Sequence, residues 1–442
     1  MRKKQGIHFY INIRNFADIV EKEENDTGNV VHSIHALDAF FSSVEAYGKN
    51  HYPDTVIIEK ITGSRLHMYV DNSNVDDAFS ATSNISKYAV ALSRYMMDNV
   101  SKYKTLSYFE IQIGASYGHF YEFVFRDNSI EELTTIGYVA NYAAKLQNLS
   151  EPDHILISQS IYDDIVSTKK SLFIPKHFEE IKKYDQSVCY DAEVRSICDS
   201  MDYTEDFNSF LTIANKINLQ DMNFRSADKR LSYQNLSKTE CKKIYGIPLF
   251  ADIRGFTSQF DENDLNLEEM TNKTQNVLQS MYDAVNYCKG VHVQFQGDRE
   301  MALFHNYSTY TCEEDAVQAG LRIIDVVKPF HVSVGVGEAI GKLFAAKIGA
   351  RGEKDNILIG RTVLDADDCE DKYAKENQLV ITEAVYAELA KKNKTLAEQF
   401  SYMGNHMYFT KKSYQEYLFY QEQKCLNSNN KNQTYNGAWK YN

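Results

Sequence analysis

Hydrophobic and polar residues follow the same order twice along this chain. Residues 6–16 read Gly-Ile-His-Phe-Tyr-Ile-Asn-Ile-Arg-Asn-Phe, and they align without a gap on residues 246–256, which read Gly-Ile-Pro-Leu-Phe-Ala-Asp-Ile-Arg-Gly-Phe. Each stretch is typical of an apolar strand that runs into a turn. A helical pattern follows in both copies, with apolar residues spaced by whole turns: Leu37, Phe40, Phe41 and Val44 in the first, and Met270, Val277, Met281 and Val285 in the second.

The repeat continues through the rest of both halves. Residues 56–65 and 291–299 each predict a hairpin, with Gly63 or Gly297 at the turn, where glycine permits a positive φ. Residues 135–146 then match residues 358–368, where a strand enters a helix, and residues 154–162 match residues 378–386 as a closing strand and helix. The repeat therefore predicts two related modules of mixed α and β structure.

The length of 442 residues suits two domains of ordinary size. We expect a first domain over residues 1–200, a polar linker over residues 201–243 and a second domain over residues 244–425. Residues 426–442 are rich in Asn, Lys and Gln, so we expect a disordered tail there.

Composition narrows the class of protein. Hydrophobic residues make up 43% and charged residues 25%, and no apolar run is long enough to span a membrane. The seven cysteines are odd in number and scattered, which predicts neither disulfides nor a zinc site. No export signal is recognisable, so a cytoplasmic location is expected. The net charge of −13 argues against nucleic-acid binding but allows a small anionic ligand held through a metal ion.

Two aspartates in the second copy lie where strands end. Asp252 closes the stretch Phe-Ala-Asp-Ile-Arg-Gly-Phe-Thr at 250–257, and Asp298 follows Gly297 at the predicted hairpin turn. A sparse carboxylate pair that leaves room for phosphate oxygens suits Mg²⁺. The backbone amides at Gly255, Phe256 and Thr257 could cradle a phosphate beside it.

These residues resemble a known family. The stretch at 250–257 together with Gln-Gly-Asp at 296–298 resembles the metal-binding signature of the class III adenylate and guanylate cyclases. In the first copy, Asn141 and Lys145 resemble the other half of the signature, in which an Asn meets the ribose and an Arg meets the phosphates. The resemblance covers residues 10–190 and 246–420. It implies an α+β chain of two ferredoxin-like class III cyclase homology domains, packed as a pseudo-twofold pair within one chain.

The two copies have complementary losses. The first has Asn12 and Ser64 at the positions of the metal aspartates, and the second has Leu364 and Asp368 at the positions of the Asn and the Arg. In the family, metal residues of one domain face the Asn and Arg of the other. The resemblance therefore implies one composite site, with Asp252 and Asp298 facing Asn141 and Lys145, and one inactive pseudosite.

The resemblance also implies roles for further residues. Two Mg²⁺ or Mn²⁺ ions would be held by Asp252, Asp298 and the carbonyl of Ile253, while Lys182 or Lys183 would add a phosphate contact. Asn141 would orient the ribose. Lys145 would neutralise charge in the transition state, although a lysine lacks the fork of the family's arginine.

The base-reading positions of the family correspond to Lys60 and Thr134. A Lys with a Thr resembles the adenylate cyclases, so cyclic AMP is one expected product. Stand-alone bacterial cyclases also resemble the pyrimidine cyclases of antiphage Pycsar systems, which make cyclic UMP or cyclic CMP. We expect a nucleoside triphosphate substrate, a monomer paired within the chain, and a downstream effector protein that binds the cyclic nucleotide. The alternative is a catalytically silent, cyclase-like protein that binds a nucleotide for regulation.

Overall fold

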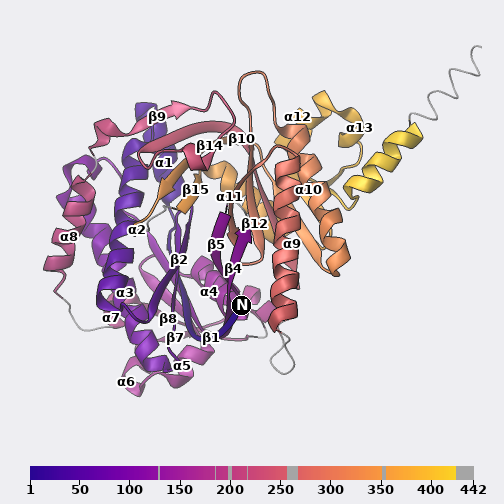
Figure 1. The fold of residues 1–442 in the computed structure, drawn as a ribbon. Coiled ribbons are helices and arrows are strands. Elements are labelled where there is room, and N and C mark those ends of the chain that lie inside the picture. Colours follow the sequence, from indigo (N-terminus) through magenta and orange to yellow (C-terminus); the bar gives the residue numbers. More distant parts are fainter. Residues whose placement is uncertain are drawn as a thin grey trace, which may run out of the picture. The chain divides into compact units, whose positions relative to one another are not determined.

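The computed structural model describes residues 1–127, 130–184, 186–197, 202–216, 218–255, 267–350 and 355–424, except the side chains of Lys183 and Leu267. Figure 1 shows their helices and strands. Chain contacts divide these residues into two compact units. The first unit contains residues 1–244, 267–272 and 342–361, and the second contains residues 245–255, 273–341 and 362–424, as far as they are described.

The first 239 residues supply the following elements. The α-helices are α1 (Phe16–Thr27), α2 (Val31–His51), α3 (Val75–Asn99), α4 (Tyr138–Leu149), α5 (Gln159–Asp164), α6 (Ser167–Lys170), α7 (Val194–Ile197) and α8 (Thr204–Asn215), and the 3₁₀ helices are η1 (Ser101–Tyr103), η2 (Glu179–Tyr184), η3 (Leu219–Asp221) and η4 (Tyr233–Asn235). The strands are β1 (Arg2–Ile13), β2 (Val56–Thr62), β3 (Arg65–Val70), β4 (Ile111–Asp127), β5 (Ile130–Ile136), β6 (His154–Ser158), β7 (Ile174–Lys176), β8 (Cys189–Glu193) and β9 (Asn223–Ser226).

The remaining residues supply a second set. The strands are β10 (Glu240–Arg254), β11 (Val291–Gln296), β12 (Arg299–His305), β13 (Ser333–Glu338), β14 (Gly341–Ile348), β15 (Asp355–Ile359), β16 (Gln378–Thr382), β17 (Ser401–Gly404) and β18 (Met407–Thr410). The helices are α9 (Leu267–Tyr287), α10 (Glu313–Val327), the 3₁₀ helix η6 (Lys328–Phe330), α11 (Arg361–Asp368), the π-helix η7 (Cys369–Tyr373), α12 (Glu383–Lys392), α13 (Lys394–Ala397) and a helix over residues 414–424.

Both sheets have the same topology, which confirms the repeat. One has the strand order β2-β3-β1-β4-β6-β8-β7, and the other has the order β11-β12-β10-β13-β16-β18-β17. Most neighbours are antiparallel, whereas β4 with β6 and β13 with β16 are parallel, so both sheets are mixed. The chain is therefore an α+β protein with two equivalent sheets.

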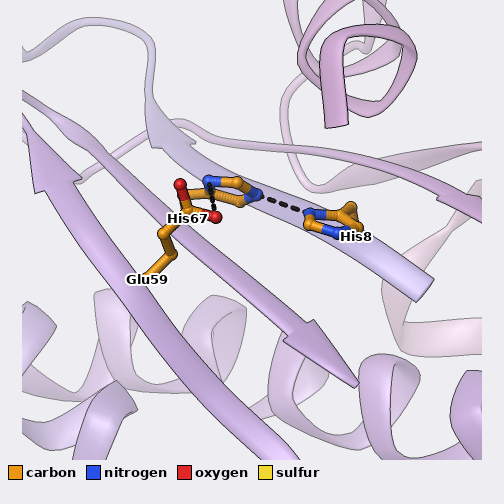
Figure 2. A group of neighbouring side chains, drawn as sticks. All are labelled: His8, Glu59 and His67. Carbon is orange, nitrogen blue, oxygen red and sulfur yellow. Dashed lines mark hydrogen bonds and ion pairs between the residues drawn. The ribbon is translucent and has the colours of Figure 1, made fainter. Parts of the chain in front are cut away.

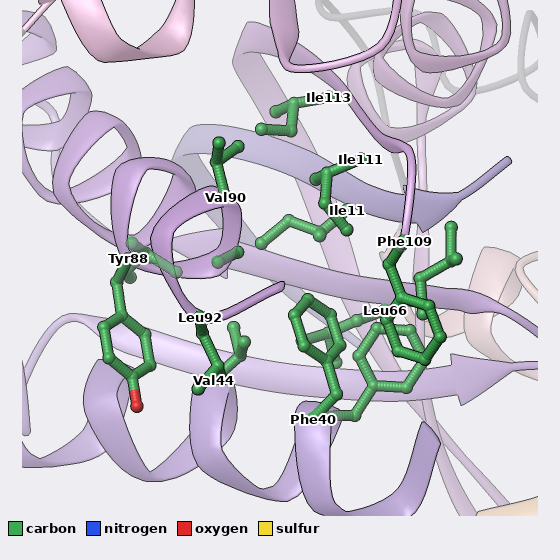
Figure 3. Packing of buried hydrophobic residues seen from close by; sticks show 14 of the residues in the cluster. Ile11, Phe40, Val44, Leu66, Tyr88, Val90, Leu92, Phe109, Ile111 and Ile113 are labelled. Atoms are coloured by element: carbon green, nitrogen blue, oxygen red, sulfur yellow. The ribbon is translucent and has the colours of Figure 1, made fainter. Parts of the chain in front are cut away.

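The core of the first unit lies on one face of its sheet. Alternate β1 residues such as Phe9 and Ile11 point to this face because side chains alternate along a strand. They pack with Phe40 and Val44 of α2 and with residues of α3. The close-up in Figure 3 shows Ile11, Phe40 and Val44 in this core. Asn74 caps α3 by accepting hydrogen bonds from the backbone of Asp76 and Asp77. Burial of each large side chain stabilises the unit by roughly 2 kcal/mol.

A helix also covers the opposite face of the sheet. Along β6, Ile155 and Ile157 join the main core, whereas Leu156 packs with Tyr142 and Leu146 of α4 in a separate cluster. The close approach of α4 depends on a glycine. A Cβ at Gly114 would lie only 2.0 Å from the backbone nitrogen of Gln147.

The second unit repeats this approach at the same positions. A Cβ at Gly337 of β13 would lie 2.3 Å from the backbone nitrogen of Glu370 and 2.5 Å from the carbonyl oxygen of Ala366. Gly137 before α4 and Gly360 before α11 both have positive φ, at 148° and 134°. These anchors make Asn141 equivalent to Leu364 and Lys145 equivalent to Asp368, as the sequence alignment predicts.

Residues 342–361 belong to the first unit although they lie late in the sequence. The backbone nitrogen of Ile61 in β2 donates to Asp355 at 2.8 Å, and that of Gly349 donates to Asp38 of α2, also at 2.8 Å. Lys342 forms an ion pair of 3.0 Å with Glu24 of α1. The sequence pattern did not predict that this segment of the second copy would belong to the first unit.

None of the helices in the described residues has the length and hydropathy that a membrane span requires.

Candidate metal and nucleotide site

Asp252 and Asp298 come together at the ends of neighbouring strands in the second unit. Asp252 lies in β10 opposite Arg299 of β12, and Asp298 is the turn residue directly before Arg299. Burial and the neighbouring charge of Asp298 raise the pKa of Asp252 to about 7. Burial also raises the pKa of Asp298 to about 7, despite a backbone hydrogen bond that lowers it. The ionised forms of the two groups therefore disfavour each other.

Two arginines lie against this carboxylate pair. The guanidinium of Arg254 donates to Asp252 at 2.9 Å and pairs with Glu370 of the π-helix at 2.5 Å. Arg299 pairs with Asp367 at 2.6 Å and with Glu370 at 2.7 Å. Both arginines therefore bind acidic residues of the α11 and π-helix segment, which the sequence analysis did not identify.

The donor set at Asp252 and Asp298 fits a hard divalent cation. Two adjacent carboxylates repel each other when both are ionised, and a cation between them stabilises the doubly ionised form. Mg²⁺ and Mn²⁺ prefer oxygen ligands of this kind. Ile253, whose carbonyl was expected as a further ligand, is a buried residue of β10 between Asp252 and Arg254.

The expected phosphate loop is described only at its start. Gly255 directly follows β10 and has a φ of 67°, a conformation that favours glycine. Phe256 and Thr257 lie outside the described residues.

In the first unit, the equivalent positions hold a neutral pair. Asn12 lies opposite Arg65 in the β1–β3 ladder, just as Asp252 lies opposite Arg299. The hydroxyl of Ser64 donates to the side-chain oxygen of Asn12 at 3.0 Å. The first copy thus has two neutral hydrogen-bonding groups at the place where the second has two carboxylates.

Asn141 and Lys145 both lie on α4 of the first unit, one helical turn apart. Asn141 is exposed and Lys145 is half-buried, so both are accessible on the helix surface. The backbone carbonyl of Asn141 accepts a hydrogen bond of 3.4 Å from Tyr184 of η2. Lys182 of η2 is exposed and pairs with Glu179 at 2.7 Å, and the side chain of Lys183 is not among those described.

Lys60 and Thr134 are both buried, and Glu59 adjoins both of them. Lys60 follows Glu59 in β2, and the β2–β3 register shifts between Ile58 and Lys60, so Glu59 occupies a bulge. The hydroxyl of Thr134 in β5 donates to Glu59 at 3.5 Å. The backbone nitrogen and hydroxyl of Thr135 donate to the same carboxylate at 3.0 and 2.5 Å.

A hydrogen-bonded chain extends from Glu59 into the sheet (Figure 2). Glu59 contacts Nδ1 of His67 at 3.1 Å, and Nε2 of His67 contacts Nδ1 of His8 at 2.8 Å. Ligand atoms of these three residues lie within 4.8 Å of one another. However, Glu59 and His8 contact opposite nitrogens of the His67 ring, which point in different directions. The arrangement is therefore a linear hydrogen-bonded chain, and a single cation could not take both neighbours of His67 as ligands without rearrangement.

The two groups of expected site residues lie in different units. Asp252, Ile253, Gly255 and Asp298 belong to the second unit, and Lys60, Thr134, Asn141, Lys145 and Lys182 belong to the first. Each half is assembled within its own unit as described above. Their meeting in one site remains a prediction.

Comparison with solved structures identifies the fold. A class III adenylyl cyclase-like ATP-binding protein from Pseudomonas aeruginosa matches with a TM-score of 0.72 and 16% identity, over 95% of this chain and 90% of that chain. The chain has a class III cyclase fold. Because the match spans nearly the whole of both chains, the class III cyclase fold accounts for both sheets.

Shorter matches are also found. The adenylyl cyclase CyaB from P. aeruginosa matches at 24% identity and a TM-score of 0.32, over 35% of this chain and 84% of that chain. The guanylate cyclase domain of RhGC from Catenaria anguillulae, in complex with GTP, matches at 18% identity and a TM-score of 0.32, over 38% of this chain and 97% of that chain. No family model and no curated protein sequence matches the chain.

Proposed function

We propose that this chain is a metal-dependent nucleotidyl cyclase. It converts a nucleoside triphosphate into a 3′,5′-cyclic nucleotide and pyrophosphate at one composite site. The observation that carries the proposal is the complementarity of the two copies. The second unit holds the carboxylate pair Asp252 and Asp298 where the first holds Asn12 and Ser64. The first unit in turn holds Asn141 and Lys145 where the second holds Leu364 and Asp368.

The two units would supply different groups to the composite site, and the second unit would supply the metal ligands. Asp252, Asp298 and the carbonyl of Ile253 would hold two Mg²⁺ or Mn²⁺ ions. When bound, these ions supply Lewis-acid stabilisation of the triphosphate and of the attacking ribose oxygen. The backbone from Gly255 through Thr257 would bind phosphate oxygens.

The first unit would supply the groups that orient and stabilise. Asn141 has an amide that can hydrogen-bond to the ribose, and it lies exposed on α4. Lys145, one turn later, would place a positive charge near the phosphate where negative charge develops in the transition state. Lys182 or Lys183 of η2 would add a second cation, since η2 packs beside α4. Lys60 and Thr134 would read the base.

A second candidate is a catalytically silent nucleotide-binding protein. Lys145 favours it, because a lysine cannot make the bidentate contacts of an arginine with a phosphate. The full-length structural match, an adenylyl cyclase-like ATP-binding protein, also favours it. Cyclic AMP, cyclic CMP and cyclic UMP are the products that the enzyme proposal allows. A role in antiphage signalling is not part of it.

The test is incubation of the purified chain with ATP, CTP, GTP and UTP in turn, with Mn²⁺ or Mg²⁺, followed by detection of pyrophosphate and cyclic product. Product from at least one triphosphate is expected. Asp298→Asn should remove it while the melting temperature is kept, and Asp283→Asn on the exposed face of α9 is the matched control that should keep full activity. Tight binding of a triphosphate with no product from the wild-type chain would establish the silent candidate instead. Binding of none of the four would exclude both.

A further inference from the structure

Arg254 occupies one oxygen of the Asp252 carboxylate and leaves the other available. Its Nη1 donates to Oδ2 of Asp252 at 2.9 Å, and within the described residues the carboxylate makes no second hydrogen bond. The Asp252 side chain is 28% exposed, so an ion can still reach it. The bond to Oδ2 is charge-assisted and strong, and the positive guanidinium repels a cation that approaches the same oxygen. Asp252 is therefore restricted to one oxygen as a metal ligand.

The other terminal nitrogen of this guanidinium is fixed by the π-helix segment. Nη2 of Arg254 donates to the backbone carbonyls of Glu370 at 2.8 Å and Ala374 at 3.2 Å, and it pairs with the Glu370 carboxylate at 2.5 Å. The Glu370 side chain is only 3% exposed. Because the guanidinium is planar and rigid, the bonds at Nη2 also hold Nη1 against Asp252.

A glycine on the neighbouring strand provides the space for the guanidinium. Gly335 of β13 lies opposite Asp252 in the sheet. A Cβ at Gly335 would lie 2.1 Å from Nη2 of Arg254 and 2.7 Å from its Cζ. Any residue with a Cβ would therefore displace the guanidinium from this place.

The first unit has the same arginine in the sequence without the same contact. The repeat aligns Arg14 with Arg254, but the Arg14 side chain is exposed. At the position of Gly335, the sheet register of the first unit places Gln112. A glutamine has a Cβ and a long side chain, so the space that the glycine leaves open in the second unit is filled in the first.

Gln112 makes contacts in the first unit that match those of the guanidinium in the second. Its amide nitrogen donates to the carbonyl of Ser150, directly after α4, and its oxygen accepts from Gln147 at 3.4 Å. Gln147 is the equivalent of Glu370, as the approach of both residues to equivalent glycines shows. The oxygen of Gln112 also accepts from Asn12 at 3.4 Å. The copy without the metal carboxylates thus has a neutral network here, and the copy with them has an arginine bound to the aspartate.

The number of available carboxylate oxygens affects divalent cations differently. Ca²⁺ takes about six to eight oxygen ligands and often binds both oxygens of one carboxylate. Mg²⁺ is smaller and octahedral, keeps several waters and needs one oxygen from each carboxylate, and Mn²⁺ also suits octahedral oxygen sites. A carboxylate restricted to one oxygen therefore removes a ligand from Ca²⁺ and none from Mg²⁺ or Mn²⁺.

We propose that Arg254 is a positioning residue that restricts Asp252 to single-oxygen ligation and so disfavours Ca²⁺ relative to Mg²⁺ and Mn²⁺. This proposal rests on the metal site of the proposed function, because it takes Asp252 as a ligand. It deepens that function by assigning the selection among cations to a residue that does not itself contact the metal. The restriction is present before any cation binds, since the guanidinium is held by groups of the second unit alone.

The experiment measures Mn²⁺ binding to the full chain without nucleotide, by electron paramagnetic resonance of the free ion, and then the displacement of Mn²⁺ by Mg²⁺ or Ca²⁺. Arg254→Met removes the guanidinium and releases the second oxygen of Asp252. The affinity for Ca²⁺ relative to Mg²⁺ should rise about tenfold, while the affinity for Mn²⁺ relative to Mg²⁺ should not change. Ratios are compared because the loss of one positive charge and any change in carboxylate protonation affect all three divalent cations alike.

Two further variants accompany this measurement. The matched control is Arg14→Met, which removes the equivalent arginine of the first unit from an exposed position and should leave both ratios unchanged. Asp298→Asn should weaken Mn²⁺ binding if the ion occupies the proposed site, so it tests the location of the ion independently of Arg254.

Each outcome decides between the claims. Failure of the wild type to bind Mn²⁺, or binding that Asp298→Asn leaves unaltered, overturns the proposed metal site and this proposal together. Binding at the site with an unchanged ratio of Ca²⁺ to Mg²⁺ affinity in a folded Arg254→Met overturns this proposal alone, and so does an equal rise in Arg14→Met. A rise confined to Arg254→Met, in a chain that forms no cyclic nucleotide, supports this proposal and removes the cyclase activity only.

A second form of the variant covers the case in which Arg254→Met does not fold. The double variant Arg254→Met with Glu370→Gln leaves no unpaired carboxylate of Glu370 in the interior, so it avoids the main cost of breaking the buried ion pair. The same rise of about tenfold in the ratio of Ca²⁺ to Mg²⁺ affinity is then required, and an unchanged ratio overturns the proposal.

Discussion

Arg254 donates a hydrogen bond of 2.9 Å to Asp252, two residues before it in the chain. The same guanidinium reaches the backbone carbonyls of Glu370 at 2.8 Å and Ala374 at 3.2 Å. Asp252 is therefore attached, through one arginine, to the segment in which α11 becomes a π-helix. This hydrogen bonding links the orientation of an expected metal ligand to the segment that the sequence analysis aligns with the family's Asn and Arg.

Replacement of Arg254 by alanine should lower the stability of the second unit. Glu370 is buried, with a pKa raised to about 8 mainly by burial, and removal of Arg254 leaves it with less positive charge around it. Breaking a buried ion pair by removal of one partner typically costs about 3–5 kcal/mol. Arg299 still pairs with Glu370, so we expect the lower end, about 3 kcal/mol, in urea unfolding at about pH 9, where Glu370 is ionised.

The double variant Arg254→Ala with Glu370→Gln separates charge from packing. Glutamine removes the unpaired carboxylate and keeps its shape, so the double variant should be more stable than Arg254→Ala alone. Equal stability of the wild type and Arg254→Ala would show that this pair does not hold the segment in place.

The sequence predicts those features of the fold that depend on residues close together in the chain. The repeat, both hairpins and the strand–helix junctions at Gly137 and Gly360 are local patterns, and the structure confirms them. The equivalence of Asn12 with Asp252 also follows from a gapless alignment, and the sheet register confirms it. Local patterns also gave no sign of a helix on the second face of the sheet.

The interactions that sequence analysis missed join residues far apart in the chain. His8 and His67 are 59 residues apart, so no ligand spacing could relate them, and sheet register alone brings them together. Arg254 and Glu370 are similarly remote. One signal was present, however: comparison of the two copies position by position shows polar residues in the first copy opposite apolar ones in the second, as at Glu59 and Val293.

The affinity of the chain for Mn²⁺ should increase as the pH rises from 6 to 8. In the metal-free protein the pKa values of Asp252 and Asp298 are both raised to about 7, so each carboxyl is largely protonated at pH 6 and ionised at pH 8. The cation requires ionised ligands and displaces these protons. Titration calorimetry should show an increase of about tenfold for one displaced proton and about a hundredfold for two.

Buffers with different heats of ionisation give the number of protons directly in the same experiment. Asp298→Asn removes one titrating group and the mutual repulsion, so its weaker binding should depend less steeply on pH. An affinity for Mn²⁺ that is constant from pH 6 to 8 would mean that these two carboxylates are not the ligands.

The stability of the second unit should fall as the pH rises from about 5 to 8 because of Glu338. This residue of β13 is fully buried, neither of its side-chain oxygens has a hydrogen-bond partner among the described residues, and burial raises its pKa to about 8. Between the ordinary pKa and about 8, the folded state therefore binds one more proton than the unfolded state. The contribution of Glu338 to the free energy of unfolding is complete below the ordinary pKa and is lost as the pH approaches 8.

The variant Glu338→Gln is expected to remove this dependence, since its amide does not titrate. Relative to the variant, the wild type should lose roughly 2 kcal/mol between pH 5.5 and pH 7.5, as measured by urea unfolding. Parallel pH profiles for the two proteins would mean that Glu338 is ionised in the folded state.

Lys145→Arg should increase turnover in the proposed cyclase. Lys145 is half-buried on α4, one turn after the exposed Asn141, so a longer side chain can be accommodated at the surface of the helix. An arginine can contact two phosphate oxygens at once, and such charge-assisted pairs are stronger than a single ammonium contact. If the contact forms in the transition state, kcat should increase about tenfold with little change in KM, and Lys145→Ala should lower kcat by a similar factor or more.

The matched control is Lys391→Arg, which changes an exposed lysine of α12 paired with Glu388 and should leave both constants unchanged. Unaltered turnover in both Lys145 variants would remove this residue from the proposed site.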